Sequence, residues 1–498
     1  MNKTIWLLSF LLVFSFTGIA QTLSDDPAVK KRQVFTSITE NELETYVQDL
    51  TSSKFKGRLA GSPEYMLSAE YVADLLEQWG IEPLGDNGSY FQYFDWPYTE
   101  VLSTGALKLF SEGKTFEMSA PEDYYPGAAS DNGTTRAEVV FAGYGISAPE
   151  LGYDDYAGID VQGKIVMIAG RTPYGGNNPE TLNKWASYSS PVYKVRNARE
   201  KGAAGVLYMD KLASPGMPYF EDFRMVHIDA HVSEQILGTP ADSILVNIRK
   251  QMNPRSFSTV FEAEITAETV HHGPGRTANI IGYIPGNDKE LSEEAIVLGA
   301  HLDGQGYLGF ELPGALDNAS GVADVLAAAR ALSHFNGQMK RSVVFIFFGG
   351  EEVGLVGSTL YCDNPPFSQE QTLLFMNLDM VGNGTGLALW HAESYPEILA
   401  HFQRNNDDYV QRPLRTSEGS MPVGRPRTDG IVFMQYGFRT LHVGTTDRVN
   451  PMYYHDPRDT ADNLTYDIMR DVSRLLFLGV LDLSNDAGIR ASEMFLIQ

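Results

Sequence analysis

From about residue 260 onward, short apolar runs alternate with stretches of helical periodicity. The apolar runs lie at residues 296–300, 343–348, 373–378, 387–390 and 441–443. Helical patterns lie at residues 319–333, 353–362, 395–404 and 464–480. Strands that alternate with helices favour a parallel sheet covered on both faces. We therefore predict an α/β fold with a mixed, mainly parallel sheet, in which ligands bind beyond the carboxyl ends of the strands.

Ionisable side chains follow these strands where the strands end. They are His301 and Asp303, Glu351 and Glu352, Asp379, and then Tyr454 and His455 beyond the last strand, with Asp317 just before the first helix. Because strand ends meet at one edge of such a sheet, we expect two imidazoles and several carboxylates to converge there. Cys362 is the only cysteine, which excludes a thiolate cluster. Imidazole and carboxylate ligands suit a divalent cation such as zinc.

Two other segments show how little each motif means alone. Glu293 and Glu294 form a second acidic pair, and His227-Ile228-Asp229 repeats the His-x-Asp pattern. The acidic pair precedes a strand, which predicts a solvated loop. The second His-x-Asp lies in a region without companion ligands. Only the ordered set at successive strand ends therefore predicts a metal site.

Five motifs form an ordered series along the chain. They are His301-x-Asp303, residues 314–321, residues 347–358, residues 377–380 and His455-x-x-x-Asp459-Thr460. As a series they resemble the M28 family of co-catalytic zinc peptidases, which are mostly aminopeptidases, and the resemblance extends to residues 57–62 and 278–286. It implies a cis peptide bond between Asp317 and Asn318. The chain departs from many members at residues 428–430, which read Thr-Asp-Gly instead of Ser/Thr-Asp-His.

The resemblance implies two zinc ions and five ligands for them. His301 and Asp379 would hold one ion, Glu352 and His455 would hold the other, and Asp317 would bridge both. The ions bring four positive charges and the three carboxylates bring three negative ones. A hydroxide shared by the two ions would complete neutrality and would attack the substrate carbonyl.

The resemblance also implies roles for residues that do not bind metal. Glu351 would be the general base, taking a proton from the shared water and returning it to the leaving amine. Asp303 would orient the first histidine ligand, and Asp459 would do the same near the second. Tyr454 would donate a hydrogen bond to the tetrahedral oxyanion.

Residues from about 105 to 255 have a different texture. Short strand-like runs are separated there by Gly, Pro and Asn turns, and residues 141–146, 153–156, 160–165 and 198–206 resemble a protease-associated (PA) domain. That resemblance implies a small β-rich lid, with a simple spacer as the alternative. We divide the chain into a signal peptide (1–20), an N-terminal part of the peptidase domain (21–104), a PA-like insert (105–255) and a C-terminal part with the metal site (256–498).

The first twenty residues read as a secretory signal. Lys3 precedes an apolar stretch over residues 5–16, and small residues lie at positions 18 and 20, which predicts cleavage after Ala20. A membrane anchor would need about 20 apolar residues. Residue 21 is Gln and not Cys, so we do not expect lipid attachment there. We expect a secreted or periplasmic protein without membrane insertion.

Net charge and site chemistry limit the function classes. The 63 acidic and 38 basic residues give a net charge of −25, which disfavours nucleic acid as a partner. Peptides are the expected substrates, and a zinc aminopeptidase is the leading hypothesis. A carboxypeptidase would need cations for the substrate carboxylate, and Arg425, Arg427, Arg439 and Arg448 are candidates. Glutaminyl cyclisation on the same fold is disfavoured by the large insert and the complete ligand set. A non-catalytic binding protein would lack ligands or the base, whereas this chain has both.

Overall fold

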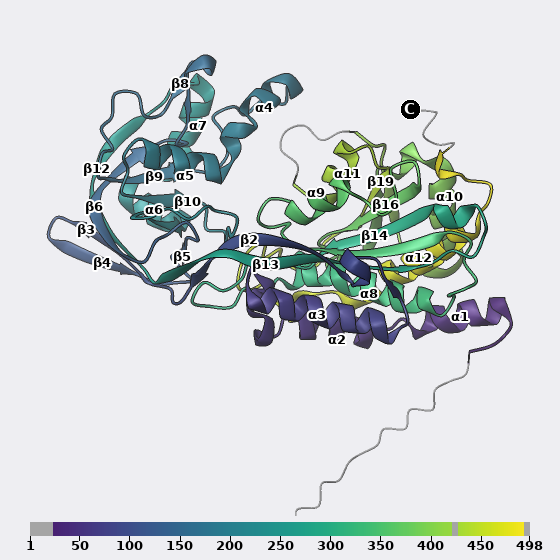
Figure 1. Cartoon of the computed structure of the whole chain (residues 1–498). Coiled ribbons are helices and arrows are strands. Elements are labelled where there is room, and N and C mark those ends of the chain that lie inside the picture. The colour runs from purple at the N-terminus through teal and green to yellow at the C-terminus, as the bar shows by residue number, and fades with distance from the viewer. Residues whose placement is uncertain (1–22, 421–426, 493–498) are drawn as a thin grey trace, which may run out of the picture.

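Two large β-sheets, each with its own helices, organise the computed structural model (Figure 1). The structure describes residues 23–420 and 427–492. The predicted signal peptide therefore lies outside the described residues. Within those ranges, no helix has the length and apolar character needed to cross a membrane.

The first sheet has the strand order β1-β13-β15-β14-β16-β19-β17-β18, with β2 paired to β13. Its strands are β1 (Glu82–Pro83), β2 (Phe91–Val101), β13 (Thr269–Ile284), β14 (Ala295–His301), β15 (Ser342–Phe348), β16 (Thr372–Leu378), β17 (Gly386–Trp390), β18 (Leu414–Thr416) and β19 (Thr440–Thr446). The four central strands β15, β14, β16 and β19 are parallel to one another. At the two sides of this group, β13 runs antiparallel to β15 and β17 runs antiparallel to β19, while the edge strand β18 is parallel to β17. The predicted mixed, mainly parallel sheet is confirmed.

Helices cover both faces of this sheet. One face packs against α2 (Glu40–Leu50), α3 (Pro63–Gln78), α8 (Ser320–Ser333) and α12 (Tyr466–Asn485), and the other against α9 (Val356–Asp363) and α11 (Asp429–Gln435). Also present are α1 (Pro27–Ser37) and α10 (Pro396–Asn405), which both contact α12. In β14, Ile296 and Leu298 pack on the first face while Val297 packs on the second. Burial on both faces explains why these strands are continuous apolar runs in the sequence.

The second sheet has the order β4-β3-β12-β6-β9-β10-β11-β5. Its strands are β3 (Ala106–Ser111), β4 (Lys114–Met118), β5 (Tyr124–Pro126), β6 (Gly133–Ala142), β9 (Ile165–Ala169), β10 (Gly205–Met209), β11 (Arg224–Ile228) and β12 (Ser256–Ala267). Four helices accompany it, namely α4 (Pro179–Trp185), α5 (Pro191–Glu200), α6 (Ala230–Leu237) and α7 (Ala241–Gln251), as does a two-stranded sheet of β7 (Ser147–Ala148) and β8 (Tyr153–Asp154). We call this part the β-rich region and the remainder the large α/β region. Because β12 belongs to it, the β-rich region extends past residue 255.

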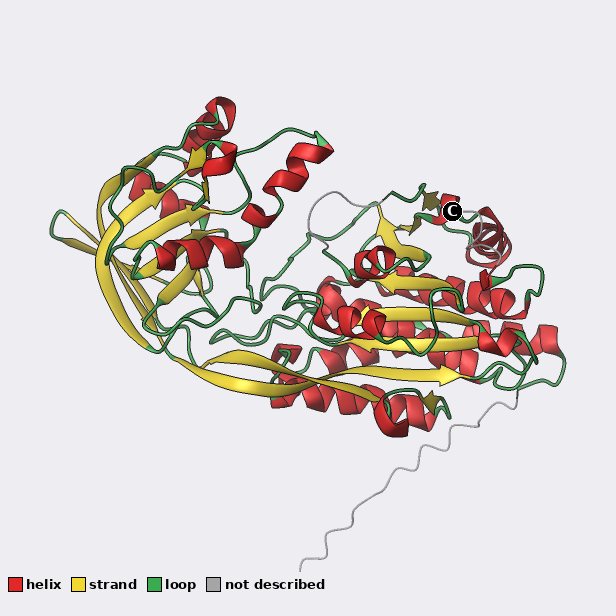
Figure 2. Cartoon of the chain, turned by 45° about the horizontal axis from the view of Figure 1, so that its top comes forward, coloured by secondary structure: helices red, strands yellow, loops and turns green. Residues whose placement is uncertain are grey.

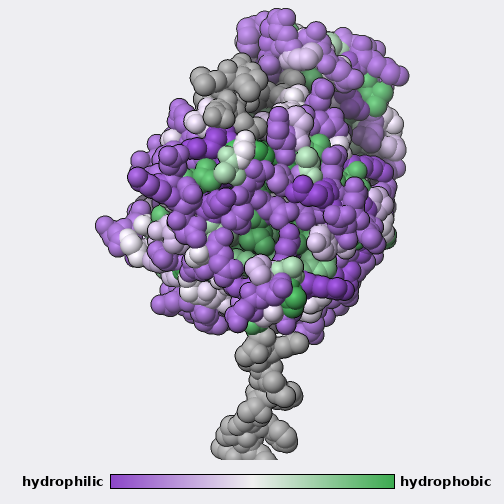
Figure 3. All heavy atoms as spheres, turned by 90° about the vertical axis from the view of Figure 1, so that its right-hand side faces the viewer, coloured by the Kyte–Doolittle hydropathy of each residue, from purple (hydrophilic) through white to green (hydrophobic). Residues whose placement is uncertain are grey.

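Two neighbouring strands connect the regions. The chain leaves the first sheet through β2 into β3 and returns through β12 into β13, and β2 and β13 pair antiparallel over most of their length. Figure 2 shows this long two-stranded ribbon running from one region to the other. The face drawn in Figure 3 is mostly hydrophilic with small apolar patches, as expected for an acidic protein.

Candidate metal centre

Asp317 lies between two imidazoles at the carboxyl edge of the first sheet. Its Oδ1 is 3.2 Å from Nε2 of His301, and its Oδ2 is 3.3 Å from Nε2 of His455. His301 ends β14, whereas His455 comes from the segment after β19. Each carboxylate oxygen therefore faces a different histidine, which is the arrangement required of a bridging ligand. The peptide bond between Asp317 and Asn318 is cis, as the resemblance predicted.

Two further carboxylates complete two groups of three possible ligands. Asp379 Oδ1 is 3.6 Å from Nε2 of His301, and Glu352 Oε2 is 3.2 Å from Nε2 of His455. Around a tetrahedral zinc ion with ligands at about 2.0 Å, neighbouring ligand atoms lie about 3.3 Å apart. The structure thus brings together all five residues predicted as ligands, in the two predicted groups, with spacings that fit zinc.

Several of these atoms have no hydrogen-bond partner. In the described part of the chain, Glu352 Oε1, Asp379 Oδ1 and His455 Nε2 are buried and make no hydrogen bond, although the last two lie near groups of opposite charge. Buried polar atoms are normally paired, so a group of unpaired ligand atoms indicates a place for a cation. Burial opposes charge on the imidazole of His455, yet Glu352 and Asp317 together raise its pKa to about 10. The cluster therefore attracts positive charge.

Main-chain carbonyls fix the tautomer of both histidines. Nδ1 of His301 lies 3.1 Å from the carbonyl oxygen of Asp303, and Nδ1 of His455 lies 2.9 Å from that of Ala213. A carbonyl oxygen can only accept, so each Nδ1 must carry the proton and donate it. This leaves the lone pair of each Nε2 for a metal ion, which is the usual arrangement for metal-binding histidines.

Two buried carboxylates hold the turns that carry the candidate ligands. Asp303 is the expected acceptor for His301, although through its main chain, whereas the contacts of Asp459 correct an expectation. Asp303 accepts from His301 through its main-chain carbonyl, while its carboxylate accepts the N–H groups of Glu351 and Glu352 at 3.0 and 3.1 Å. Contrary to expectation, Asp459 makes no hydrogen bond to His455 among the described residues. Its carboxylate accepts the N–H groups of Leu316 and Asp317, at 2.8 and 3.1 Å. Burial raises the pKa of Asp303 and of Asp459 to about 7.

Arg58 and Asn318 support the site, and we did not predict a role for either. The fully buried guanidinium of Arg58 donates to the carbonyls of Leu302, Pro313 and Gly314, beside two ligand-bearing turns, and to that of Leu50. The Asn318 side chain donates to Leu378 O and accepts from Gly321 and Met380 N–H. For Arg58, the resemblance over residues 57–62 was the only sequence signal.

Two predicted catalytic side chains border the ligands. A carboxylate oxygen of Glu351 lies within 4.8 Å of the ligand atoms of His301 and Glu352, and burial raises the pKa of Glu351 well above its ordinary value. The ring of Tyr454 stacks on that of His455 with centroids 3.7 Å apart, and Tyr454 is 40 % exposed. Asp429, buried at the start of α11, has its pKa raised to about 7 by burial.

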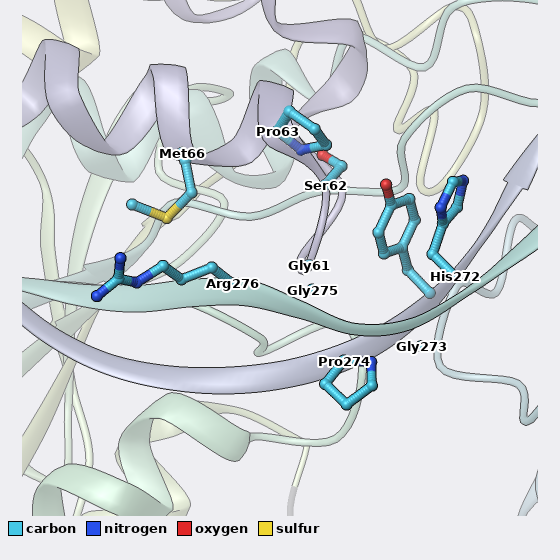
Figure 4. Close-up of a pocket in the computed structure, with 10 residues that line it drawn as sticks. Gly61, Ser62, Pro63, Met66, His272, Gly273, Pro274, Gly275 and Arg276 are labelled. Atoms are coloured by element: carbon cyan, nitrogen blue, oxygen red, sulfur yellow. The ribbon is translucent and has the colours of Figure 1, made fainter.

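A cavity of about 430 Å³ lies elsewhere, between the start of α3 and β13. Figure 4 shows Ser62, Met66, His272 and Arg276 among the residues around it. None of the five candidate ligands lines this cavity. A much smaller cavity of about 10 Å³ adjoins Asp317 and His455. We therefore locate the candidate site by its ligand chemistry and not by cavity size.

Comparison with known families agrees with this geometry. Residues 279–479 match the model of peptidase family M28, and residues 134–235 match the PA domain. The fold and site thus define a metallopeptidase with a PA domain. The chain therefore contains an M28 peptidase region and a PA domain, as its motifs predicted.

Individual relatives extend this similarity. The chain is 25% identical over 382 residues to aminopeptidase YwaD of Bacillus subtilis, covering 73% of this chain and 71% of the relative. An aminopeptidase structure from Aneurinibacillus sp. strain AM-1 superposes with a TM-score of 0.61 at 22% sequence identity. The match covers 90% of this chain and 95% of the Aneurinibacillus chain. The structure of BSAP, a zinc aminopeptidase from Bacillus subtilis, superposes with a TM-score of 0.61 at 19% sequence identity. This match covers 91% of this chain and 97% of the BSAP chain. At these identities the two structures establish a shared fold.

Proposed function

We infer that the protein is an aminopeptidase that uses two zinc ions to remove N-terminal residues from peptides. The observation that carries this inference is the Asp317 carboxylate, whose two oxygens face His301 and His455 at 3.2 and 3.3 Å. The names of the relatives support the same activity. His301 and Asp379 would hold one ion, and Glu352 and His455 the other.

The side chains around the ligands suit peptide hydrolysis. When bound, two zinc ions would lower the pKa of a shared water and polarise the substrate carbonyl. Glu351 would accept a proton from that water and pass it to the leaving amine. Its raised pKa favours the first of these steps, because a stronger base takes the proton of the water more readily. Tyr454 would donate its hydroxyl hydrogen to the oxyanion.

The charge around the site favours a substrate with a free amino terminus. Glu351 and Asp429 add carboxylates to the three that are candidate ligands, and such a surrounding suits an α-ammonium group. Among the arginines considered for a carboxypeptidase, Arg439 is buried and donates to the carbonyls of Leu373 and Thr372, inside the sheet. Arg425 lies outside the described residues. A non-catalytic binding protein is disfavoured because Glu351 and the five candidate ligands lie together.

The predicted signal peptide supports a secreted or periplasmic location. Export to such a compartment fits a peptidase that acts on external peptides. N-terminal sequencing of the protein from the culture or periplasmic fraction would find Gln21 as the first residue if cleavage follows Ala20.

The activity can be tested with one pair of substrates and one pair of variants. We expect turnover of an aminoacyl-anilide and none of an N-blocked peptide; turnover of only the blocked peptide would overturn the proposal. The Glu351→Gln variant should lose about 10²–10⁴-fold in kcat while it retains zinc. Glu293→Gln, the same change in the exposed member of the other acidic pair, should behave as the parent. Unchanged turnover in Glu351→Gln would remove Glu351 from its role.

A further inference from the structure

A loop of the β-rich region lies against the metal centre. Residues 210–217 follow β10 and lead toward β11, and we call them the 210–217 loop. The main chain of Ala213 in this loop makes two hydrogen bonds with His455. Its carbonyl accepts from the side-chain Nδ1 at 2.9 Å, and its N–H donates to the main-chain carbonyl of His455 at 3.3 Å. The partners lie 242 residues apart in the chain.

The same loop also contacts the turn that carries Glu352. A Cβ on Gly216 would lie 3.0 Å from Cα of Val353 and 3.1 Å from the carbonyl oxygen of Glu352, so the loop packs directly on this backbone. Glu352 and His455 are the two ligands proposed for one ion. The 210–217 loop therefore touches both non-bridging ligands of that position.

A partly buried hydrogen bond holds the β-rich region beside His455. Tyr125 of β5 is 1% exposed, and its hydroxyl donates to Oδ2 of Asp456 at 3.0 Å. Asp456 directly follows His455. The loop is in turn tied to the β-rich region by Lys211, whose ammonium pairs with Asp229 at 3.2 Å.

At the other ion position, the β-rich region makes no hydrogen bond to the side chains of His301 and Asp379 among the described residues. The carbonyl that fixes His301 belongs to Asp303, two residues further along the same turn. Asp303 is itself held by the N–H groups of Glu351 and Glu352, within the large α/β region. One histidine is thus positioned from within its own region and the other from across the domain boundary.

We propose that the β-rich region is a positioning element for one of the two metal sites. Through the Ala213 carbonyl it sets the tautomer and direction of His455, so that zinc affinity at the Glu352/His455 position depends on its docking, whereas affinity at the His301/Asp379 position does not. This rests on the two-zinc site of the proposed function. It gives the PA domain a role beyond that of a lid or spacer.

Zinc titration of the full-length apoprotein against a competing chelator tests this proposal. Gly216→Ala forces the loop away from Val353, and Gly175→Ala is the matched control because a Cβ there meets only Cδ of Arg249 at 3.8 Å. Tyr125→Phe removes the contact to Asp456. Tyr124→Phe is its control, since the Tyr124 hydroxyl donates to the Thr104 carbonyl, away from the site.

We expect Gly216→Ala and Tyr125→Phe to lower the zinc affinity of one site about tenfold or more and to leave the affinity of the other site unchanged. Losses of this size are typical when groups that orient metal ligands are disturbed. Anomalous scattering should locate the weakened ion between Glu352 and His455. Both controls should titrate as the parent does. Equal weakening of both sites, or no change in either, would overturn the proposal while the proposed function stands. A parent that binds no zinc would overturn both.

Discussion

The two regions of the molecule contain the same short pattern, His301-x-Asp303 in the large α/β region and His227-x-Asp229 in the β-rich region. His301 ends the parallel strand β14, and His227 lies near the end of the parallel strand β11. Both imidazoles are buried at 2% exposure. In both histidines, Nδ1 lies 3.1 Å from a main-chain carbonyl oxygen. Sequence pattern, strand position and burial therefore do not distinguish them.

The two histidines differ in what surrounds Nε2, on the side of the ring away from Nδ1. Burial opposes charge on His301, but Asp317 and Asp379 raise its pKa well above the ordinary value. Nε2 of His227 has no hydrogen-bond partner among the described residues, and burial lowers the pKa of His227 to about 4. One histidine is in a cation-attracting cluster and the other is a neutral core residue. Carboxylates from other strand ends, and not the motif itself, distinguish the candidate metal site.

The largest effect is expected from the same substitution at both histidines. His301→Gln removes one proposed ligand, so it should lose one zinc ion and about 10³-fold or more of kcat/KM, since each ion supplies several kcal/mol of transition-state stabilisation. His227→Gln should keep two zinc ions and the parent activity. Metal analysis and anilide assays on both variants check this. Equal zinc loss in the two variants would erase the distinction drawn here.

A smaller effect concerns stability and pH. The folded-state pKa of His227 lies below its ordinary value, so the unfolded chain binds more protons and stability falls as the pH drops below about 6.5. Between about pH 7.5 and about pH 5 this contributes a loss of about 2 kcal/mol in the free energy of unfolding. His227→Gln should lack that part of the loss.

Urea denaturation at the two pH values checks this expectation. The midpoint of His227→Gln should shift less on acidification than that of the parent. A variant whose midpoint shifts as much as the parent's would show that His227 is not a source of acid sensitivity.

The sequence predicted the sheet and indicated the candidate ligands because both depend on local patterns. Apolar runs that are buried on two faces mark β14, β15 and β16, and polar residues at their ends follow from strand geometry. The prediction that Glu294 lies in a solvated loop is wrong. Its carboxylate is buried and pairs with Arg341 and Arg490, each at 2.8 Å. Arg490 is distant in the chain, so no local pattern reveals this pairing.

The supporting contacts were the least predictable part of the site. Main-chain groups position both histidines, and a carbonyl such as that of Ala213 has no signature in the sequence. Arg58 also acts on main-chain carbonyls, from turns that meet only in the folded protein. The contacts that orient the candidate ligands thus depend on tertiary packing, whereas the identity of the candidate ligands follows from the sequence pattern.

Anomalous diffraction at the zinc absorption edge, from crystals of the zinc-loaded protein, tests the central claim most directly. Two peaks about 3.5–4 Å apart are predicted, one on each side of the Asp317 carboxylate. One should lie beside His301 and Asp379 and the other beside Glu352 and His455, with none at His227. A single peak at Asp317, no peak there, or a peak at His227 would contradict the account.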